Sequence, residues 1–405
     1  MLSVNSSKET KNNPLAIPLS KKVLSVAPSV TLEIAAKAKE MASRGMDVIS
    51  LSAGEPDFDT PEFIKEAAIQ ALKKGQTKYT PATGTLDLRK AIVKKLERDQ
   101  GIQFPPEQII VSTGAKHAIF NVLFALLNPQ DEVIIPAPYW LSYPEMVTVL
   151  GGTNVIIPTD ESTDFKVKPE QLSKALNTKS KIFILNSPSN PTGAVYSKEE
   201  LLALVAVLKK HPQVVILSDE IYEKLIFDHQ KHYSIASLDG EIAKRTVIVN
   251  GMSKAYAMTG WRLGYAACPW KELAVAVGSI QSHSTSNATS FSQAGGVVAL
   301  EQGGEEARKM CEIFEKRRDL LYEKIKTIPT LKPFRAQGTF YLFVNIAATK
   351  IKSVPLSQAL LDEAHVAVVP GGPFGSDQHI RLSFAASEKS LLEAVARIEN
   401  WLKKR

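Results

Sequence analysis

Short runs of apolar residues alternate with amphipathic helical segments between about residues 62 and 299. Runs of this length, flanked by turn-forming residues, are typical of strands buried on both faces of a parallel sheet. The alternation therefore predicts an α/β domain around a mostly parallel sheet. The predicted strands are QIIVSTG (108–114), DEVIIPAP (131–138), NVIIPT (154–159), KIFILNSP (181–188), VVILSDE (214–220), RTVIVNG (245–251) and RLGYAAC (262–268).

The N-terminal part of the chain shows two other patterns. Residues 1–24 are rich in Ser, Asn and Lys, a composition that buries little apolar area, so we expect an arm. The segment 31–45 spaces its apolar residues at helical intervals and stops at Gly45, as a helix with a C-terminal glycine cap would. The apolar positions of this predicted helix are Leu32, Ala35, Ala36 and Met41.

The tail from about residue 300 begins with a charged amphipathic segment over 305–328, which predicts a long helix. Two strand-like runs, GTFYLFVNI (338–346) and HIRLSFA (379–385), and a last helix follow. We expect residues 25–61 and 300–405 to form a smaller α+β domain beside a large domain over 62–299. A chain of 405 residues is long enough for two domains.

Composition and charge narrow the function classes. The net charge of +7 comes from 49 basic and 42 acidic residues without basic runs, which favours a solvated surface over a nucleic-acid interface. Cys268 and Cys311 have no CxxC spacing, so neither disulfides nor a zinc site is expected. The start of the chain lacks a signal-peptide pattern, and no apolar run reaches the length of a membrane span. We expect a cytoplasmic enzyme-sized protein.

Polar residues follow four of the predicted strands, where open α/β sheets place their ligands. The GxGxxG fingerprint and the P-loop pattern are both missing, which argues against nucleotide chemistry. The four strand ends are expected to converge on one ligand. They are Thr113–Lys116, Asn186–Gly193, Ser218–Tyr222 and Asn250–Lys254.

Three of these strand ends suggest chemistry. Gly114 and Ala115 open a helix whose free amides could bind an anion, although this signal alone is weak. Asp219 and Glu220 point to opposite sides of a strand, so only one of them can face a ligand, and an ordinary strand end entering solvent is the simpler interpretation. Lys254 lies between a buried strand and an apolar segment, where a desolvated amine becomes a nucleophile for carbonyls.

Several segments resemble, in order, the signature blocks of class I aminotransferases of pyridoxal-phosphate fold type I. The resemblance covers roughly residues 25 to 400. Within the class, the chain is similar to the bacterial-type aspartate aminotransferase subgroup, some of whose members also transaminate prephenate. It implies a large domain with a mostly parallel seven-stranded sheet between helices, plus a smaller α+β domain. The blocks are AGEPDF (53–58), TKYTPATG (77–84), STGAKHAIFN (112–121), PAPYWLSYPEM (136–146), NSPSNPTGAVY (186–196), SDEIYEKLIFD (218–228), NGMSKAYAMTGWRLGYAA (250–267) and HIRLSFA (379–385).

The resemblance implies pyridoxal 5'-phosphate as cofactor and assigns it ligands. Lys254 matches the lysine that links covalently to the cofactor's aldehyde. Asp219 matches the carboxylate paired with the pyridine nitrogen, which keeps the ring able to accept electrons. Tyr222 and Asn190 match the groups that hydrogen-bond the ring oxygen, and Trp140 matches the aromatic side chain that stacks on the pyridine face.

The phosphate of the cofactor is assigned a second set of residues. Arg262, whose planar fork suits a phosphate, and Ser253 match the family's phosphate ligands together with the amides of Gly114 and Ala115. Tyr79 matches a phosphate ligand that comes from the neighbouring subunit, which implies a homodimer with shared active sites.

The substrate contacts follow from the same resemblance. Arg381 matches the arginine that binds the α-carboxylate by a bidentate pair, with the Gly54 backbone nearby. The animal and enteric enzymes bind the side-chain carboxylate with a second arginine, which the matching stretch SIQSHSTSNATS (279–290) lacks. In the resembling subgroup, a lysine at the position of Lys116, also next to the cofactor, and a threonine at the position of Thr31 take this role. Ala27 replaces the basic residue expected in prephenate-active members.

These features favour an aminotransferase that moves the amino group of aspartate or glutamate to a 2-oxo acid with ping-pong kinetics. A broad aromatic or prephenate aminotransferase and a same-fold C–S β-lyase remain alternatives, because the site selects which bond of the substrate breaks. A regulator that uses the fold to bind a ligand would need a DNA-binding domain, for which the arm is too short. His229 and His232, with Asp228 expected as the only nearby acid and Lys231 between them, are interpreted as structural and not as metal ligands.

Overall fold

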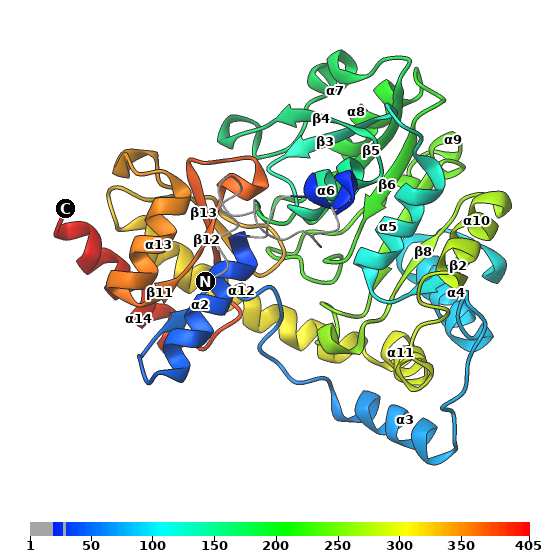
Figure 1. Ribbon diagram of the computed structural model, residues 1–405, viewed down its shortest axis with the longest axis horizontal. Helices are drawn as coiled ribbons and strands as arrows, with labels where there is room; N and C mark the ends of the chain where they lie inside the picture. Colours follow the sequence, from blue (N-terminus) through cyan, green and yellow to red (C-terminus); the bar gives the residue numbers. More distant parts are fainter. Residues whose placement is uncertain (1–18, 27–29) are drawn as a thin grey trace, which may run out of the picture.

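The computed structural model describes residues 19–26 and 30–405, without the side chain of Leu32. Two parts lie next to each other in Figure 1, a larger one around a wide sheet and a smaller one that contains the C-terminus. Residues 1–18 of the predicted arm and Ala27 lie outside the described part of the chain. Residues 20–24 of the arm contribute α1 (Lys21–Leu24), which is capped by Ser20 and buries none of its residues.

A seven-stranded sheet forms the centre of the larger part, in the order β2-β8-β7-β6-β5-β3-β4. Only β8 runs antiparallel to its two neighbours, so the expectation of a mostly parallel seven-stranded sheet is confirmed. Each predicted apolar run supplies one strand. The strands are β2 (Ile109–Ser112), β3 (Glu132–Ala137), β4 (Thr153–Pro158), β5 (Ser180–Asn186), β6 (Val215–Asp219), β7 (Thr246–Gly251) and β8 (Gly264–Ala267).

Helices cover both faces of this sheet because its central strands are apolar on both faces. Leu217 of β6 packs with residues of α5 and α10 on one face, whereas Ile216 packs with residues of α7 and α8 on the other. This two-residue alternation fixes which strand-end side chains point to each face. The helices of this part are α3 (Glu62–Lys73), α4 (Leu86–Gln100), α5 (Ala115–Leu126), α6 (Ser142–Val149), α7 (Pro169–Ala175), α8 (Lys198–Leu208), α9 (Gly240–Ala243), α10 (Lys271–Ser282) and α11 (Ser290–Gln302).

The smaller part contains a four-stranded antiparallel sheet in the order β12-β13-β10-β9 and its own apolar core. A short parallel pair joins β1 to β11, which attaches the N-terminal segment to the C-terminal one. The strands are β1 (Ile49–Ser50), β9 (Lys332–Pro333), β10 (Tyr341–Asn345), β11 (Val366–Ala367), β12 (Val369–Pro370) and β13 (His379–Ser383). The helices are α2 (Val30–Ser43), α12 (Gly304–Lys326), α13 (Ser353–Ala364) and α14 (Glu388–Lys403).

The predicted helix near residues 31–45 is present as α2, and its buried face matches the expected one only in part. Among the described side chains of this helix, Ile34 and Ala38 are buried, Met41 packs against the same small core, and Leu32 is not described. Ala36, which was expected on the apolar face, is exposed. Alanine gives little directional information because it is tolerated on either face of a helix.

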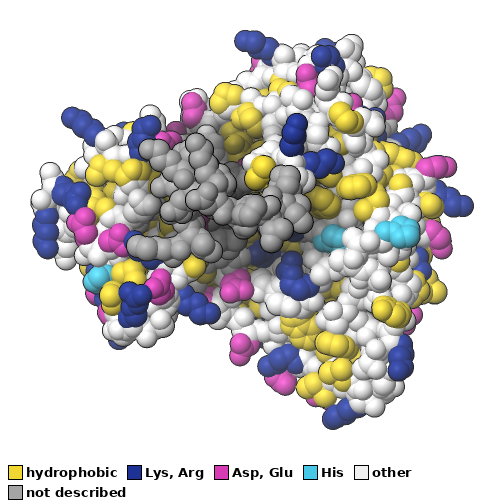
Figure 2. Space-filling model, viewed as in Figure 1, with side chains coloured by type: hydrophobic (Ala, Val, Ile, Leu, Met, Phe, Trp, Pro, Cys, Tyr) yellow, Lys and Arg dark blue, Asp and Glu magenta, His cyan; other side chains and the backbone are white. Residues whose placement is uncertain are grey.

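Connections between the elements include several single 3-10 turns. These are η2 (Pro106–Gln108), η3 (Glu161–Thr163), η4 (Ile235–Ser237), η5 (Thr259–Trp261), η6 (Ala347–Thr349) and η7 (Gly372–Phe374). Both cysteines are free. Among the helices of the described residues, none is long and apolar enough to cross a bilayer. On the face seen in Figure 2, lysine and arginine side chains are interspersed with acidic ones.

Candidate active site

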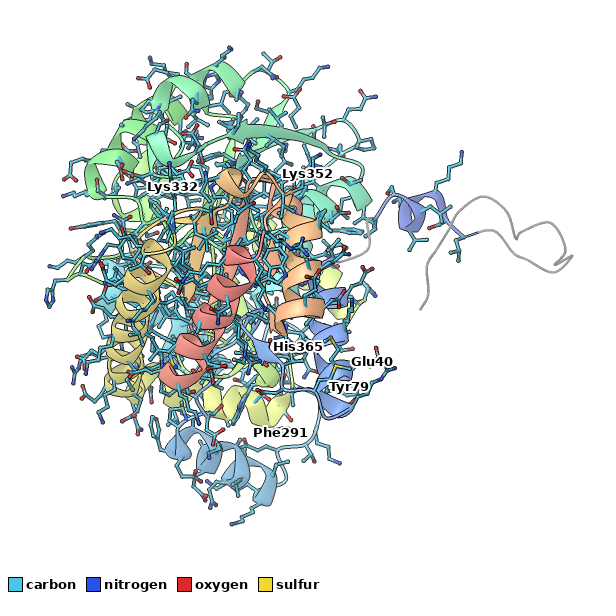
Figure 3. The ribbon with its side chains drawn as sticks, turned by 90° about the vertical axis from the view of Figure 1, so that its left-hand side faces the viewer. Glu40, Tyr79, Phe291, Lys332, Lys352 and His365 are labelled. Atoms are coloured by element: carbon cyan, nitrogen blue, oxygen red, sulfur yellow. The ribbon has the colours of Figure 1, made fainter. Side chains whose placement is uncertain are left out.

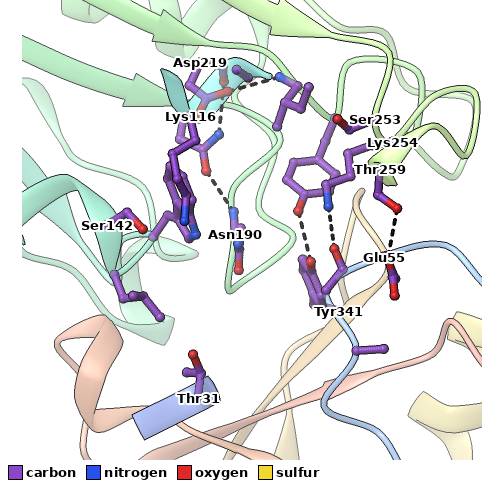
Figure 4. Close-up of a pocket in the computed structure, with 18 of the residues that line it drawn as sticks. Thr31, Glu55, Lys116, Ser142, Asn190, Asp219, Ser253, Lys254, Thr259 and Tyr341 are labelled. Carbon is purple, nitrogen blue, oxygen red and sulfur yellow. Dashed lines mark hydrogen bonds between the residues drawn. The ribbon is translucent and has the colours of Figure 1, made fainter. Parts of the chain in front are cut away.

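A cavity of about 590 Å³ lies at the carboxyl ends of the parallel strands, and residues of both parts of the molecule line it. Strand ends, the start of α5 and the loop after β1 supply its walls, as Figure 4 shows. It brings together most of the site residues predicted from the sequence. They are Thr31, Gly54, Ala115, Lys116, Trp140, Asn190, Asp219, Tyr222, Ser253, Lys254, Arg262 and Arg381.

Two predicted site residues do not line this cavity. Gly114 lies next to Arg262, whose guanidinium occupies the space that a Cβ on residue 114 would need. Tyr79 is 89% exposed, and Figure 3 shows it at the outer surface of the molecule. A role for Tyr79 in a cavity of this kind therefore requires a second chain.

Lys254 follows β7 and reaches into the middle of the cavity. Its Nζ donates a hydrogen bond to the Gly54 carbonyl. Burial, assisted by the positive charge of Arg381, lowers the pKa of Lys254 to about 8. An amine with this pKa is partly neutral near neutral pH and can act as a nucleophile and as a base.

Asp219 ends β6 and is 3% exposed at the cavity wall. The Tyr143 hydroxyl donates to its Oδ2 at 2.6 Å, and the Ile221 amide donates to its Oδ1 at 3.2 Å. Burial raises the pKa of Asp219 to about 6 even though both hydrogen bonds lower it. A cationic partner in the cavity would stabilise the charged carboxylate that the protein alone stabilises poorly.

The start of α5 and Arg262 form an anion seat at one end of the cavity. Gly114 has a φ of 83° and caps the 12-residue helix without a side chain, and Ala115 and Lys116 at the start of this helix line the cavity. A Cβ on Gly114 would lie 2.6 Å from Arg262 Nη2, and one on Gly264 would lie 2.3 Å from the Ala115 nitrogen. The Arg262 Nη1 donates to the Thr259 carbonyl at 2.8 Å. Only glycines allow this close approach of helix start and guanidinium, an arrangement suited to a phosphate.

A second cationic group occupies the side of the smaller part. Arg381 Nη1 donates to Asn190 Oδ1 at 2.9 Å, and its Cζ lies 4.1 Å from the centre of the Tyr341 ring. The Nε of Arg381 is buried and has no hydrogen-bond partner among the described residues. This guanidinium is therefore available for a carboxylate in the cavity.

Lys116 provides a third positive charge, in the first turn of α5. Its Nζ lies 4.8 Å from the centre of the Trp140 ring. Burial lowers the pKa of Lys116, and the nearby Arg262 lowers it further. Thr31 of α2 lines the same cavity from the other side (Figure 4).

Several groups that contact these residues were not predicted from the sequence. Tyr143 bonds Asp219, Tyr341 contacts Tyr222 and Arg381, and Phe374 lies 5.2 Å from the Arg381 guanidinium. Aromatic residues within apolar segments are ordinarily core residues, so only the three-dimensional contacts separate these from the rest. Glu55, which accepts a hydrogen bond from the Thr259 hydroxyl at 2.8 Å, belongs to a recognised block but was given no role.

The expected surroundings of His232 were wrong. Asp228 instead binds Arg318 at 2.8 Å, whereas the Nε2 of His232 lies 3.1 Å from Glu220, far along the chain but close in space. Glu220, Glu223 and His232 bring their ligand atoms within 4.8 Å of one another. Lys95 already forms an ion pair with Glu223 there, and an ammonium at this position competes with a metal ion.

Comparison with known proteins agrees with this arrangement. The sequence model described as aminotransferase class I and II matches residues 46–398. Aspartate aminotransferase of Bacillus subtilis is 46% identical over 95% of this chain and 99% of its own length. Aspartate/prephenate aminotransferase of Cereibacter sphaeroides is 46% identical over 94% and 98%. Among solved structures, aspartate aminotransferase of Thermus thermophilus with maleate has a TM-score of 0.90 and 42% identity, over 95% of this chain and 100% of that one.

Proposed function

The chain belongs to the class I and II aminotransferase family, whose aspartate aminotransferases use pyridoxal 5'-phosphate, and we propose that it transfers the amino group of aspartate or glutamate to a 2-oxo acid such as 2-oxoglutarate. The observation that carries this proposal is the cavity itself. It holds a lysine with a lowered pKa between a buried carboxylate and an anion seat, with two further cations for a dicarboxylate.

The residues of the cavity fit the cofactor. Arg262, Ser253 and the first amides of α5 would hold the phosphate. Gly114 and Gly264 leave these donors uncovered because neither residue has a side chain. Asp219 would hold the ring nitrogen, with Tyr222 and Asn190 at the ring oxygen and Trp140 on the ring face. When bound, the cofactor takes up the electron pair released as the substrate's Cα–H bond breaks.

Lys254 is proposed as the catalytic base. Its pKa of about 8 leaves a fraction of the amine neutral near neutral pH, so Nζ can accept the proton from the substrate's Cα. The same Nζ would then hold that proton, so that it can be given back within the closed site. A second oxo acid then uses the same groups in reverse, which gives ping-pong kinetics.

Asp219 acts through its charge. Without a cationic partner its pKa is about 6, because burial outweighs the hydrogen bonds from Tyr143 and Ile221. Pairing with a protonated ring nitrogen satisfies the carboxylate and keeps that nitrogen protonated. The Tyr143 hydroxyl orients the carboxylate from the side of α6.

Arg381 and Lys116 are proposed to bind the two carboxylates of the substrate. Arg381 would bind the α-carboxylate, next to the Gly54 backbone, while Asn190 holds the guanidinium in place at 2.9 Å. Lys116, with Thr31 facing it across the cavity, would bind the side-chain carboxylate. This division explains a preference for dicarboxylic substrates without a second arginine.

A Lys116→Ala variant tests the dicarboxylate preference. An unpaired buried carboxylate costs about 2–4 kcal/mol, so kcat/KM for aspartate should fall roughly 30- to 1000-fold. The value for phenylalanine should fall far less, since that donor has no side-chain carboxylate. If all donors fall by one common factor, Lys116 supports only the neighbouring phosphate seat. Lys94, an exposed helical lysine outside the cavity, provides the matched control as Lys94→Ala.

An activity matrix of donors and acceptors tests the reaction itself. Wild-type protein with aspartate and 2-oxoglutarate should yield oxaloacetate and glutamate. Release of pyruvate with ammonia or sulfide from cysteine-type substrates would instead identify a C–S β-lyase. Prephenate belongs in the same matrix because relatives 46% identical to this chain are named aspartate/prephenate aminotransferases.

We further propose a homodimer with shared active sites, acting in the cytoplasm. Besides Tyr79, the apolar side chains of Ile69 and Leu72 on α3 are exposed, and they line a shallow groove with Trp261 and Phe291. Tyr79 and Phe291 lie on the same side of the molecule in Figure 3. A second copy of the chain would cover this surface and bring Tyr79 to the partner's phosphate seat.

Mixing two inactive variants tests the shared site. One chain carries Tyr79→Phe alone, and the other carries Lys254→Ala. In the mixed dimer one site can combine Lys254 and Arg262 of the first chain with Tyr79 of the second, so part of the activity should return. Hybrid dimers that form without recovering activity would refute sharing through Tyr79.

A further inference from the structure

Tyr341 of β10 lies in the cavity wall between two groups that already have proposed roles, and it has none itself. Its side chain is buried, with 1% exposed. The Tyr341 hydroxyl lies 3.0 Å from the Tyr222 hydroxyl, and its ring lies under the Arg381 guanidinium. Figure 4 shows the side chain at this junction.

The ring contact follows from strand register. β10 and β13 are antiparallel, with Phe343 opposite Arg381 and Tyr341 opposite Ser383, so Tyr341 is the diagonal neighbour of Arg381. The Arg381 Cζ lies 4.1 Å from the centre of the Tyr341 ring. A guanidinium over a ring face gains a cation–π attraction and loses freedom to tilt. The ring therefore helps to keep the donors of Arg381 directed at the cavity.

The hydroxyl contact has a definite direction once the cofactor is bound. Each tyrosine hydroxyl has one proton to donate. If Tyr222 donates its proton to the cofactor's ring oxygen, Tyr341 has to be the donor in the 3.0 Å contact. A hydrogen bond received by Tyr222 strengthens the one that it donates. Burial raises the pKa of Tyr341, and of the charged groups that act on it Arg381 lowers this pKa and Glu55 raises it.

We propose that Tyr341 is a positioning residue that acts on both halves of the site, on the cofactor's ring oxygen through Tyr222 and on the substrate's α-carboxylate through Arg381. This role rests on the proposed function. Its two contacts are separable, because the hydroxyl's hydrogen-bond partner among the described residues is Tyr222, whereas the ring face contacts Arg381. A phenylalanine keeps the ring and removes the hydroxyl, whereas a leucine removes both.

Two equilibrium measurements on the cofactor-loaded protein separate the contacts without any turnover. The first is the pH titration of the bound cofactor's absorbance. The second is the Kd for maleate, a dicarboxylate without an amino group. A matched control is Tyr265→Phe, which also removes a buried hydroxyl, on β8 outside the cavity, that has no partner among the described residues.

Tyr341→Phe should move the absorbance titration to higher pH by about half a unit. A weaker hydrogen bond from Tyr222 leaves more negative charge on the cofactor's ring oxygen. That charge raises the pKa of the group whose proton loss the absorbance reports. The maleate Kd of this variant should stay within about twofold of wild type. Tyr341→Leu should add a weakening of maleate binding of roughly 3- to 30-fold, from the lost ring face. Tyr265→Phe should change neither quantity.

A Tyr341→Phe titration that coincides with wild type would overturn the role of the hydroxyl. Equal maleate Kd values for the Phe and Leu variants would overturn the role of the ring. If the Leu variant does not fold, Tyr341→Met, which fills a similar volume without a ring, gives the same comparison. Wild-type protein that bound neither cofactor nor maleate would overturn the proposed function and this role together.

Discussion

Asp219 and Glu220 follow each other at the end of β6, and both are almost fully buried, at 3% and 1% exposed. Their surroundings are nevertheless opposite. Asp219 faces the cavity and receives two hydrogen bonds from the protein, and its pKa is raised to about 6 by burial. Glu220 points away from the cavity, and its pKa is lowered to about 2 in spite of an equally buried position.

The difference lies in the number of donors. Glu220 Oε1 receives the hydroxyls of Ser218 and Ser234 at 2.8 and 2.6 Å. Its Oε2 receives Gln100 Nε2 at 2.7 Å and lies 3.1 Å from His232 Nε2. Burial opposes the charge at both carboxylates, but His232 and the other donors outweigh it only at Glu220.

The contrast separates a structural carboxylate from a functional one. A carboxylate whose acceptor sites are filled by the protein stabilises the fold and has little capacity for a ligand. A carboxylate that is buried and left short of donors costs stability until a cation arrives, and such sites mark ligand positions. By this criterion we propose Asp219 as the carboxylate of the active site and Glu220 as part of the framework behind it.

The largest expected effect is on turnover. Asp219→Asn should lower kcat on the order of a thousandfold, about 4 kcal/mol, because the ring nitrogen loses its charge partner. Cofactor should remain bound through the phosphate seat and Lys254, which reduction with borohydride and peptide mapping would show. Glu220→Gln, measured in the same assay, should keep most of the activity per folded molecule. Near-wild-type turnover of Asp219→Asn would reverse the assignment of the two carboxylates.

The opposite orientation of the two carboxylates could be predicted from the sequence. Alternation along β6 already required Asp219 and Glu220 to face opposite sides, and the cavity contains Asp219 alone of the pair. The seven strands were recognisable because buried parallel strands are apolar runs with little dependence on distant contacts. The residues quoted from the aminotransferase blocks also converge, apart from Gly114 and Tyr79.

The other half depended on long-range contacts that no local pattern encodes. Gln100 lies 120 residues from Glu220 and His232 lies 12 residues from it across an irregular loop, so the donors that distinguish Glu220 from Asp219 were not foreseen. The same holds for Tyr341, which reaches Tyr222 through the packing of the two parts. In α2, Ala36 was placed on the buried side but is exposed, because small alanine side chains leave the orientation of the helix to Ile34.

Stability should respond to Glu220 next. Glu220→Gln keeps the size of the side chain but places an amide among four donors, which leaves buried donors unpaired. A loss of about 2–4 kcal/mol in the free energy of unfolding is expected. Urea denaturation at fixed protein concentration measures it. Glu241→Gln, at an exposed acid of the same part, is the control, and an equal midpoint for both variants would contradict the structural role of Glu220.

Asp219→Asn should have the opposite sign in cofactor-free protein. The pKa of Asp219 in the folded protein is about 6, above the ordinary 3.8. The protonated Asp219 therefore contributes to the free energy of unfolding below pH 3.8, and this contribution is lost as pH rises to about 6. The asparagine avoids this loss, and the variant should be more stable than wild type above pH 6 by up to roughly 3 kcal/mol. Urea midpoints at pH 5 and pH 8 measure the difference. A variant less stable than wild type at pH 8 would show that Asp219 is already satisfied without a ligand.

The smallest effect concerns a single donor of Glu220. His232→Ala removes one of the four groups around the carboxylate and should cost about 1–2 kcal/mol, less than Glu220→Gln, because three donors remain. His229, three residues earlier and exposed, is the matched control, and His229→Ala should leave the urea midpoint unchanged.

The pKa of Glu220 is lowered partly by His232. The contribution of this carboxylate to the free energy of unfolding is therefore present above pH 4.5 and is lost as pH falls towards 2. Acid unfolding of His232→Ala should therefore begin at higher pH than that of wild type or His229→Ala. Identical acid midpoints for the two histidine variants would mean that Ser218, Ser234 and Gln100 alone hold the charge of Glu220.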